Sequence, residues 1–336
     1  MEVMSADIIP APACAEQGQH EGRGASRTQG ALSAIDTIAP VHIPIMVGEV
    51  LECLRLAPGH VVVDCTFGGG GHAEAMLHLV RPGGRLLGLD VDPLELPLAD
   101  ARLRAAGFGQ AELVTRRASF AELPAIMTAE RFPPANAVLA DLGTSSMQND
   151  TPARGFSYKG VGPLDMRMNP LEGMSAAELI AQVSAEELTA LLEANADEPH
   201  AALIAGVLCQ HRVQTTHAAE RLIRAGLKAA LPALPRAEVK MSIRRTFQAL
   251  RIAVNDEFRA LDALLAGLPG CLAPGGRVAI LTFHSGEDRR VKKAFAAGRR
   301  AGVYAAVSDA VIRSAKAETF ANRRASAAKL RWAERG

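Results

Sequence analysis

Four consecutive glycines, Gly68 to Gly71, are the first residues along the chain that suggest chemistry. They follow the β-branched run 61–65, which predicts a strand, and precede a helical stretch over 73–80. Because glycine has no Cβ, a ligand can approach the backbone closely there, beside a helix N-terminus that attracts negative groups. The turn therefore predicts a ligand site, and a plain glycine turn without a ligand is the open alternative.

An acidic residue, Asp90, ends the next predicted strand, 85–90, about twenty residues after the glycines. A carboxylate at this position can accept hydrogen bonds from both hydroxyls of a ribose, or it can cap the helix predicted over 94–105. The glycine turn and the acid together favour a ligand that contains a nucleoside, which NAD and S-adenosylmethionine both do. No Gly-x-x-x-x-Gly-Lys-Ser/Thr motif occurs, which excludes a P-loop nucleotidase.

Polar side chains also follow the fourth and fifth predicted strands. The strand 136–141 ends in Asp141 and continues through small hydroxyl residues to Gln148, and His284 follows the strand 277–283. The carboxyl ends of parallel strands line the edge of a sheet where ligands of open α/β folds bind. We therefore expect a polar active site there, although a turn with helix-capping serines explains the Asp141 segment equally well on its own.

Strands and helices must alternate to bring these residues together, and the pattern predicts such alternation. Helical stretches separate most of the predicted strands, which is typical of a doubly wound, Rossmann-like α/β sheet. The strands are expected at 61–65, 85–90, 111–115, 136–141 and 277–283.

The alternation stops after Asp141 and returns with an amphipathic helix predicted over 243–265. In between, Ser175 and Ser184 each open a capping-box helix. We predict a flexible N-terminal leader at 1–40, a discontinuous core at 41–149 and 243–336, and an inserted helical substrate-recognition subdomain at 150–242.

The composition of the 336 residues narrows the class of protein. Hydrophobic residues make up 49% and charged residues 22%, which supplies enough apolar surface for packed cores. Lys and Arg number 37 against 36 Asp and Glu, but residues 286–336 carry 13 against 5. This predicts a polyanionic partner near that end, or a solvated basic tail. Scattered cysteines without C-x-x-C, and no apolar run of about 18 residues, predict a cytoplasmic protein without a membrane span.

Several of these segments occur together, in the same order, in a known family. Over roughly residues 42–335, the chain resembles the RsmH (MraW) family of bacterial small-subunit ribosomal RNA methyltransferases. Departures from the family pattern lie at 196–203, where relatives are richer in arginine, and at Gly286, where leucine is usual. The main matching segments are Asp64-x-Thr-Phe-Gly-x-Gly-Gly-His72, Asp90-x-Asp-Pro93, Asp141-Leu-Gly-x-Ser-Ser-x-Gln148, Arg154-Gly-Phe-Ser157, Gly162-Pro-Leu-Asp-Met-Arg-Met168, Arg245-Thr-Phe-Gln-Ala-Leu-Arg-Ile252 and Phe283-His-Ser285.

The resemblance implies a class I methyltransferase core with a helical insertion, and S-adenosylmethionine as the methyl donor with no metal. It implies the N4 amino group of one cytidine in the decoding region of 16S rRNA as the acceptor, and hence the small ribosomal subunit as the partner. The cofactor contacts that it implies are Gly70, Gly71 and His72 at the methionine end, Asp90 on the ribose, Phe120 beside the adenine, and Asp141 and Gln148 across the site.

The reaction requires in-line displacement at the methyl carbon and an acceptor for a proton of the amine. We expect Asp141 to be that acceptor, and His284 to be the second candidate. Asp141 could instead serve only the cofactor, and His284 could be structural. The acceptor base must leave its stack, and Phe156 or Tyr158 could hold it unless they are core residues.

Basic residues are expected to contact the RNA, and a steep salt dependence of binding follows from them as a set. A NAD-linked oxidoreductase and an assembly factor without catalysis are the competing hypotheses, and the oligomeric state is left open, a homodimer included. The basic residues that we nominate are Arg154, Arg167, Arg244, Arg245, Arg251, Arg289, Arg290, Lys292, Lys293, Arg323, Arg324, Lys329 and Arg331.

Overall fold

The computed structural model describes residues 44–336. These belong to the second of two compact units, residues 42–336, and the leader predicted at 1–40 lies outside the described residues. In the described part of the chain, no helix is long and apolar enough to cross a membrane.

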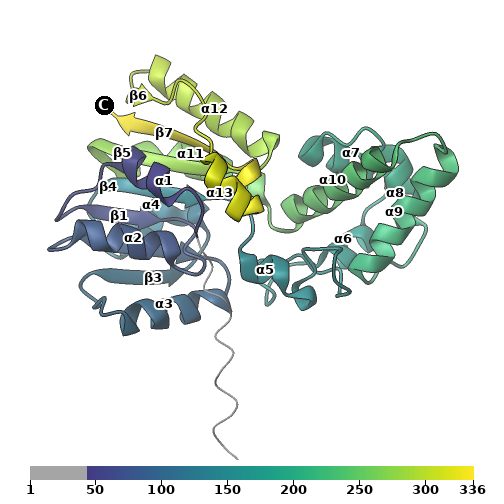
Figure 1. The fold of residues 1–336 in the computed structure, drawn as a ribbon, viewed down its shortest axis with the longest axis horizontal. Coiled ribbons are helices and arrows are strands. Elements are labelled where there is room, and N and C mark those ends of the chain that lie inside the picture. The colour runs from purple at the N-terminus through teal and green to yellow at the C-terminus, as the bar shows by residue number, and fades with distance from the viewer. Residues whose placement is uncertain (1–43) are drawn as a thin grey trace, which may run out of the picture. The chain divides into compact units, whose positions relative to one another are not determined.

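A seven-stranded sheet in the order β3-β2-β1-β4-β5-β7-β6 forms the centre of the α/β part (Figure 1). The first five strands in that order are parallel, and β7 runs antiparallel to both β5 and β6. This confirms the predicted Rossmann-like fold class. The strands are β1 (Val61–Asp64), β2 (Arg85–Asp90), β3 (Leu113–Arg117), β4 (Ala135–Asp141), β5 (Leu272–Thr282), β6 (Tyr304–Val307) and β7 (Lys329–Arg335).

Alternate residues of each central strand point to opposite faces of the sheet, and helices cover both faces. On one face Val62 and Leu86 pack with α1 (Val47–Leu54), α2 (Gly71–Val80) and α3 (Glu95–Ala105). On the other face Val63 and Leu87 pack with α4 (Leu123–Ala129), α11 (Glu257–Cys271) and α12 (Ser285–Arg300). Strands buried on both faces explain the continuous β-branched and aliphatic runs of the sequence.

A third hydrophobic cluster lies among the helices that follow β4. The capping boxes predicted at Ser175 and Ser184 are confirmed, each with its Glu three residues later. The boundary predicted at residue 243 falls inside α10, whose Ile243 and Phe247 pack in this third cluster. The domain division itself stays a prediction. The remaining helices are α5 (Ser146–Asp150), α6 (Ala176–Gln182), α7 (Ala185–Ala196), α8 (Ala201–Cys209), α9 (Thr216–Ala230), α10 (Arg236–Val254) and α13 (Lys316–Ala321), with 3₁₀ turns η1 (Phe120–Glu122), η2 (Pro152–Arg154) and η3 (Arg323–Ala327).

The single long helix predicted over 243–265 is wrong, because the chain breaks between α10 and α11 at Asn255 and Asp256. Asp256 has a left-handed backbone (φ +50°), and the Asn255 side chain leaves the helix pattern to bond a distant loop. Its Oδ1 accepts from Met168 N (2.7 Å) and its Nδ2 donates to Met166 O (2.8 Å). Apolar periodicity continues on both sides of the break, so a tertiary contact decides where the helix ends.

Candidate active site at the carboxyl edge of the sheet

The glycine turn joins β1 to α2, and local geometry already requires its glycines. Gly68 and Gly70 have left-handed backbones (φ +46° and +76°). A Cβ on Gly71 would lie 2.8 Å from the ring of Pro44, and one on Gly70 would lie 3.2 Å from Leu103. The turn thus brings the N-terminus of α2 to the edge of the sheet, where its first N–H groups have no partner within the helix.

Asp90 holds this turn against the end of β2. Its Oδ2 accepts from Gly68 N (2.7 Å) and its Oδ1 accepts from Asp92 N (2.9 Å). The turn before α3 is closed by Asp92 instead, whose Oδ1 accepts from Leu94 N at 2.9 Å. Each oxygen of Asp90 accepts one bond from the backbone, and a carboxylate oxygen can accept a second. Asp90 therefore has the position and the capacity expected of a ribose-binding acid.

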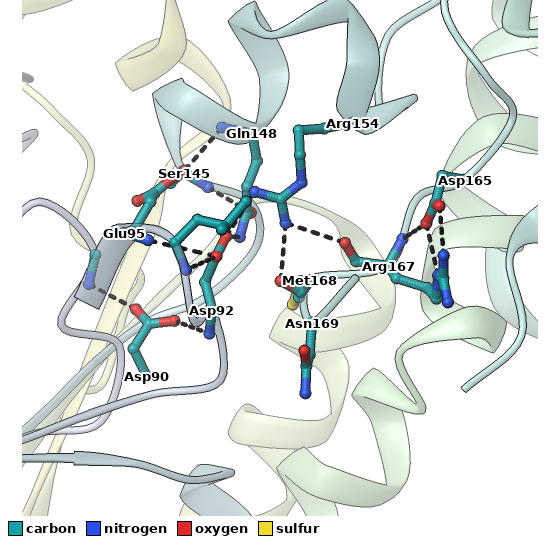
Figure 2. A network of polar contacts seen from close by, with 12 residues as sticks. Asp90, Asp92, Glu95, Ser145, Gln148, Arg154, Asp165, Arg167, Met168 and Asn169 are labelled. Carbon is teal, nitrogen blue, oxygen red and sulfur yellow. Dashed lines mark hydrogen bonds and ion pairs between the residues drawn. The ribbon is translucent and has the colours of Figure 1, made fainter. Parts of the chain in front are cut away.

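A buried polar network connects Asp90 with the segment after β4, as Figure 2 shows. The Asp92 carboxylate is buried, and its Oδ2 accepts from Gln148 Nε2 (2.9 Å) and from Arg154 Nη1 (2.8 Å). The other side of the Gln148 amide accepts from Ser145 N at 3.1 Å, and the Ser145 hydroxyl donates to Glu95. Both functional groups of the Gln148 side chain thus already have protein partners, and its contact with the cofactor stays a prediction.

Asp141 lies at the end of β4, beside the first turn of α2. Its Oδ2 is 3.7 Å from Nε2 of the buried His72, and its backbone N–H donates to Thr66 Oγ1 (2.7 Å). Its Oδ1 is buried and has no hydrogen-bond partner among residues 44–336. Burial, with the nearby charges of Asp64 and Glu287, raises the pKa of Asp141 to about 8. An unsatisfied acid at this edge is suited to accept a proton from a ligand.

His284 caps α12 at the end of β5 and belongs to a second cluster. Its Nε2 is 3.2 Å from Glu287 Oε1, and Glu287 Oε2 accepts from Phe283 N (2.8 Å). Although burial opposes it, hydrogen bonding and charge from His284 hold the pKa of Glu287 below its ordinary value. Glu257, His284 and Glu287 bring ligand atoms within 4.8 Å of one another, but both Glu257 oxygens accept from Arg251. We therefore describe this cluster as an ion-pair network.

The aromatic residues divide between core and site. Phe156 is buried in the third cluster, as its core alternative predicted. Tyr158 is half-buried and meets Phe247 edge to face, with ring centroids 5.1 Å apart. Phe120 opens η1 and is partly buried against the second cluster, so its place beside an adenine stays a prediction.

Several arginines and lysines nominated for RNA contact are bound within the fold. Arg154 is buried on Asp92, Arg251 on Glu257, and Lys329 and Arg331 both pair with Asp288. These charges hold segments of the fold together. The sequence did not indicate this, because none of the acidic partners is adjacent in the chain to its basic residue. In contrast Arg244, Lys292, Lys293 and Arg323 are exposed and have no ion pair among the described residues.

A basic helix face that sequence analysis missed lies on α9. His217, Arg221, Arg224 and Lys228 are all exposed, at spacings of three and four residues that place them on one side of the helix. Tyr158 lies within electrostatic range of Arg244 and Arg224. The spacing was the available signal, and it was overlooked because α9 follows no strand of the sheet.

A seven-stranded sheet with an antiparallel β7 between β5 and β6, a glycine turn after β1 and an acid after β2 defines the class I S-adenosylmethionine-dependent methyltransferase fold. Within that class, the chain belongs to the MraW methylase family, whose model matches residues 39–336.

Close relatives support the family assignment. The chain is 45% identical over 302 residues to ribosomal RNA small subunit methyltransferase H 2 of Alkaliphilus metalliredigens, covering 88% of this chain and 86% of that protein. It is 43% identical over 310 residues to ribosomal RNA small subunit methyltransferase H of Myxococcus xanthus, covering 88% and 97%.

Proposed function

We propose that this protein transfers the methyl group of S-adenosylmethionine to the N4 amino group of a specific cytidine in 16S rRNA of the small ribosomal subunit, in the cytoplasm. Family membership and the names of the relatives support the class of reaction and the rRNA substrate. The observation that carries the chemistry is Asp141, whose buried Oδ1 has no partner among residues 44–336 and lies where a class I fold presents its reacting groups.

The described residues fit the donor. Asp90 and the glycine turn suit a ribose, and the buried Glu287, whose pKa is held below its ordinary value, offers negative charge near a sulfonium cation. His72 and Asp141 come together at this edge, and Glu287, which pairs with His284, lies within electrostatic range of Asp141. When bound, the donor supplies an electrophilic methyl group.

The chain then has to position the amine and remove one of its protons. The N4 lone pair forms the new bond to the methyl carbon while the electron pair of the broken C–S bond stays on sulfur. Asp141 Oδ1 accepts a hydrogen bond from N4–H and takes the proton as positive charge develops on the nitrogen. His284 is the second candidate, since its Nδ1 has no hydrogen-bond partner among the described residues.

RNA contact is supported by the exposed basic face of α9 together with Arg244 of α10. Tyr158 is half-buried, packs edge to face on Phe247 and lies within electrostatic range of Arg244 and Arg224, and its ring would support an unstacked base.

Transfer of labelled methyl to small subunits that lack the modification tests the proposal. Label recovered as N4-methylcytidine at a single site supports it. Absence of label in subunits and in naked RNA, despite tight binding of S-adenosylhomocysteine, would favour the hypothesis of an assembly factor without catalysis. Thermal stabilisation by NADH and not by S-adenosylhomocysteine would favour an oxidoreductase.

A further inference from the structure

Arg154 connects the turn after β2 with the loop that follows η2. Its Nη1 donates to Asp92 Oδ2 (2.8 Å), while its Nη2 donates to the carbonyls of Arg167 (3.1 Å) and Met168 (2.8 Å). In Figure 2 the guanidinium lies between these two groups of acceptors. Both charged side chains are at least nine-tenths buried, so water does not compete for these bonds.

The loop that Arg154 holds, residues 155–168, contains the two aromatic residues that the sequence analysis nominated to hold the acceptor base. Phe156 and Tyr158 are in its first half, and the Arg154 guanidinium lies 5.9 Å from the centre of the Phe156 ring. At the far end Asn255 binds Met166 and Met168 through its side-chain amide. Arg154 therefore ties both the start of the loop and its end at Arg167 and Met168 to the turn after β2. Asn255 ties the same end of the loop to α10.

We propose that the Asp92–Arg154 pair is a positioning element that holds the acceptor loop 155–168 at a defined place relative to Asp90. Arg154 is then a positioning residue that aligns the acceptor base with the methyl donor, and it does not contact RNA phosphate. This inference rests on the proposed function in one respect, namely that the loop holds the acceptor base. The contacts themselves are independent of that function.

Arginine is required at this position for a geometric reason. A planar guanidinium offers separate N–H groups to a carboxylate on one side and to two carbonyls on the other. A lysine ammonium is a compact point charge, and it could pair with Asp92 or reach the loop carbonyls but would not span both. Arg154→Lys therefore keeps the buried charge and removes the connection.

The test compares Arg154→Lys with the matched control Arg116→Lys in the full chain. Arg116 of β3 also binds a carboxylate through two N–H groups, that of Glu130, but this pair is exposed. We expect Arg154→Lys to bind S-adenosylhomocysteine within about threefold of wild type and to lose roughly 100-fold in single-turnover methyl transfer at saturating donor. The control is expected to match wild type in both measurements.

Hydrogen exchange separates this inference from the proposed function. Amides of 155–168 should exchange faster in Arg154→Lys than in wild type or in Arg116→Lys, whether or not the wild type methylates subunits. Absence of transfer by wild type would overturn the proposed function alone. Unchanged exchange in the loop, or transfer within about threefold of wild type, would overturn the positioning role.

A second variant decides the case in which Arg154→Lys does not fold. Asn255→Ala keeps the Asp92–Arg154 pair and the bonds from Arg154 to the end of the loop, and it removes the contacts that tie this end to α10. Loss of transfer with S-adenosylhomocysteine affinity retained supports the proposal. Full transfer together with unchanged exchange in 155–168 contradicts it.

Discussion

At the scale of single residues, burial and neighbouring charge set the chemistry of the site. Asp141 is surrounded by Asp64, Glu287 and His72, and it keeps one oxygen without a hydrogen-bond partner among the described residues. A carboxyl group in such a place binds its proton more tightly than in water. The pKa of Asp141 therefore lies close to neutral pH, which is the range in which a proton acceptor is most effective.

Asp141→Asn is expected to slow single-turnover transfer at saturating donor by about 10²–10⁴-fold, because the amide cannot take the proton. In wild type, kcat/KM should rise with pH up to about 8, where Asp141 of the free protein becomes ionised, and then level off. The Asn variant should lose this rise. Asp100→Asn, which removes the partner of Arg104 on α3, is the control, and an unimpaired single-turnover rate in Asp141→Asn would exclude Asp141 as the acceptor.

Gly88 of β2 shows how packing supports the glycine turn. A Cβ at this position would lie 2.3 Å from the ring of Phe67, the residue that precedes the four glycines. We expect Gly88→Ala to lower the free energy of unfolding by roughly 1–3 kcal/mol and to weaken S-adenosylhomocysteine binding, since Phe67 must move. Urea unfolding with Gly48→Ala as control checks this, because a Cβ on Gly48 meets nothing within 4 Å. Equal stability of both variants would contradict the packing argument.

At the scale of elements, two helices carry opposite charge on their exposed faces. The α9 face presents His217, Arg221, Arg224 and Lys228, whereas α7 presents Glu186, Glu187 and Glu193. A polyanion would be attracted to the first face and repelled by the second. The basic C-terminal segment is less available than its composition suggests, because Asp288 binds both Lys329 and Arg331.

Replacing Arg221 and Lys228 with glutamine should weaken binding to small subunits and flatten its salt dependence. The slope of log K against log salt is expected to fall by about 0.7–1 for each phosphate that the variant no longer neutralises. Binding of S-adenosylhomocysteine should be unchanged, because α9 contains none of the residues assigned to the cofactor. Filter binding at several salt concentrations measures the effect, with Glu186→Gln and Glu193→Gln on α7 as the control. An unchanged slope would remove α9 from the RNA surface.

At the scale of the whole molecule, buried acids make stability depend on pH. Burial raises the pKa of Asp64 and of Glu95 to about 7, and that of Asp141 to about 8. The folded state therefore holds protons that the unfolded chain releases above about pH 4. Since the folded state binds more protons in this window, its stability falls as pH rises from about 4 to 8.

The melting temperature of the protein without ligand should consequently decrease between pH 5 and pH 8. Asp141→Asn should show a smaller decrease, because one of the titrating groups is gone. Below pH 4 the melting temperature should instead decrease as the pH falls. Hydrogen bonds from Arg81 lower the pKa of Glu112 to about 2, and this ion pair is lost when Glu112 becomes protonated in acid. Differential scanning calorimetry at a series of pH values measures the decrease in melting temperature at both ends of this range. A melting temperature that rises from pH 5 to pH 8 would contradict the burial argument.

The parts of the structure that depend on neighbours in sequence could be predicted from the sequence. Alternating apolar runs and glycine turns predicted β1, β2, β4 and the parallel sheet, and the capping boxes at Ser175 and Ser184 formed as expected. The strand-end positions of Asp90, Asp141 and His284 followed from the same patterns. These are local features, since backbone preference and side-chain periodicity act within a few residues.

Only the tertiary structure decided which distant groups meet. Arg154 reads as a surface cation in the sequence, yet it binds Asp92, 62 residues away, in the protein interior. The helix break at Asn255 depends on a loop 87 residues earlier, and β7 lies between β5 and β6 only after the chain has passed through α12. Such contacts leave no periodic pattern, because they join groups far apart in the chain, and the pairing offsets the cost of removing both groups from water. The sequence by itself determined the type of fold and the polar residues that end its strands, and long-range burial decided how those residues are held.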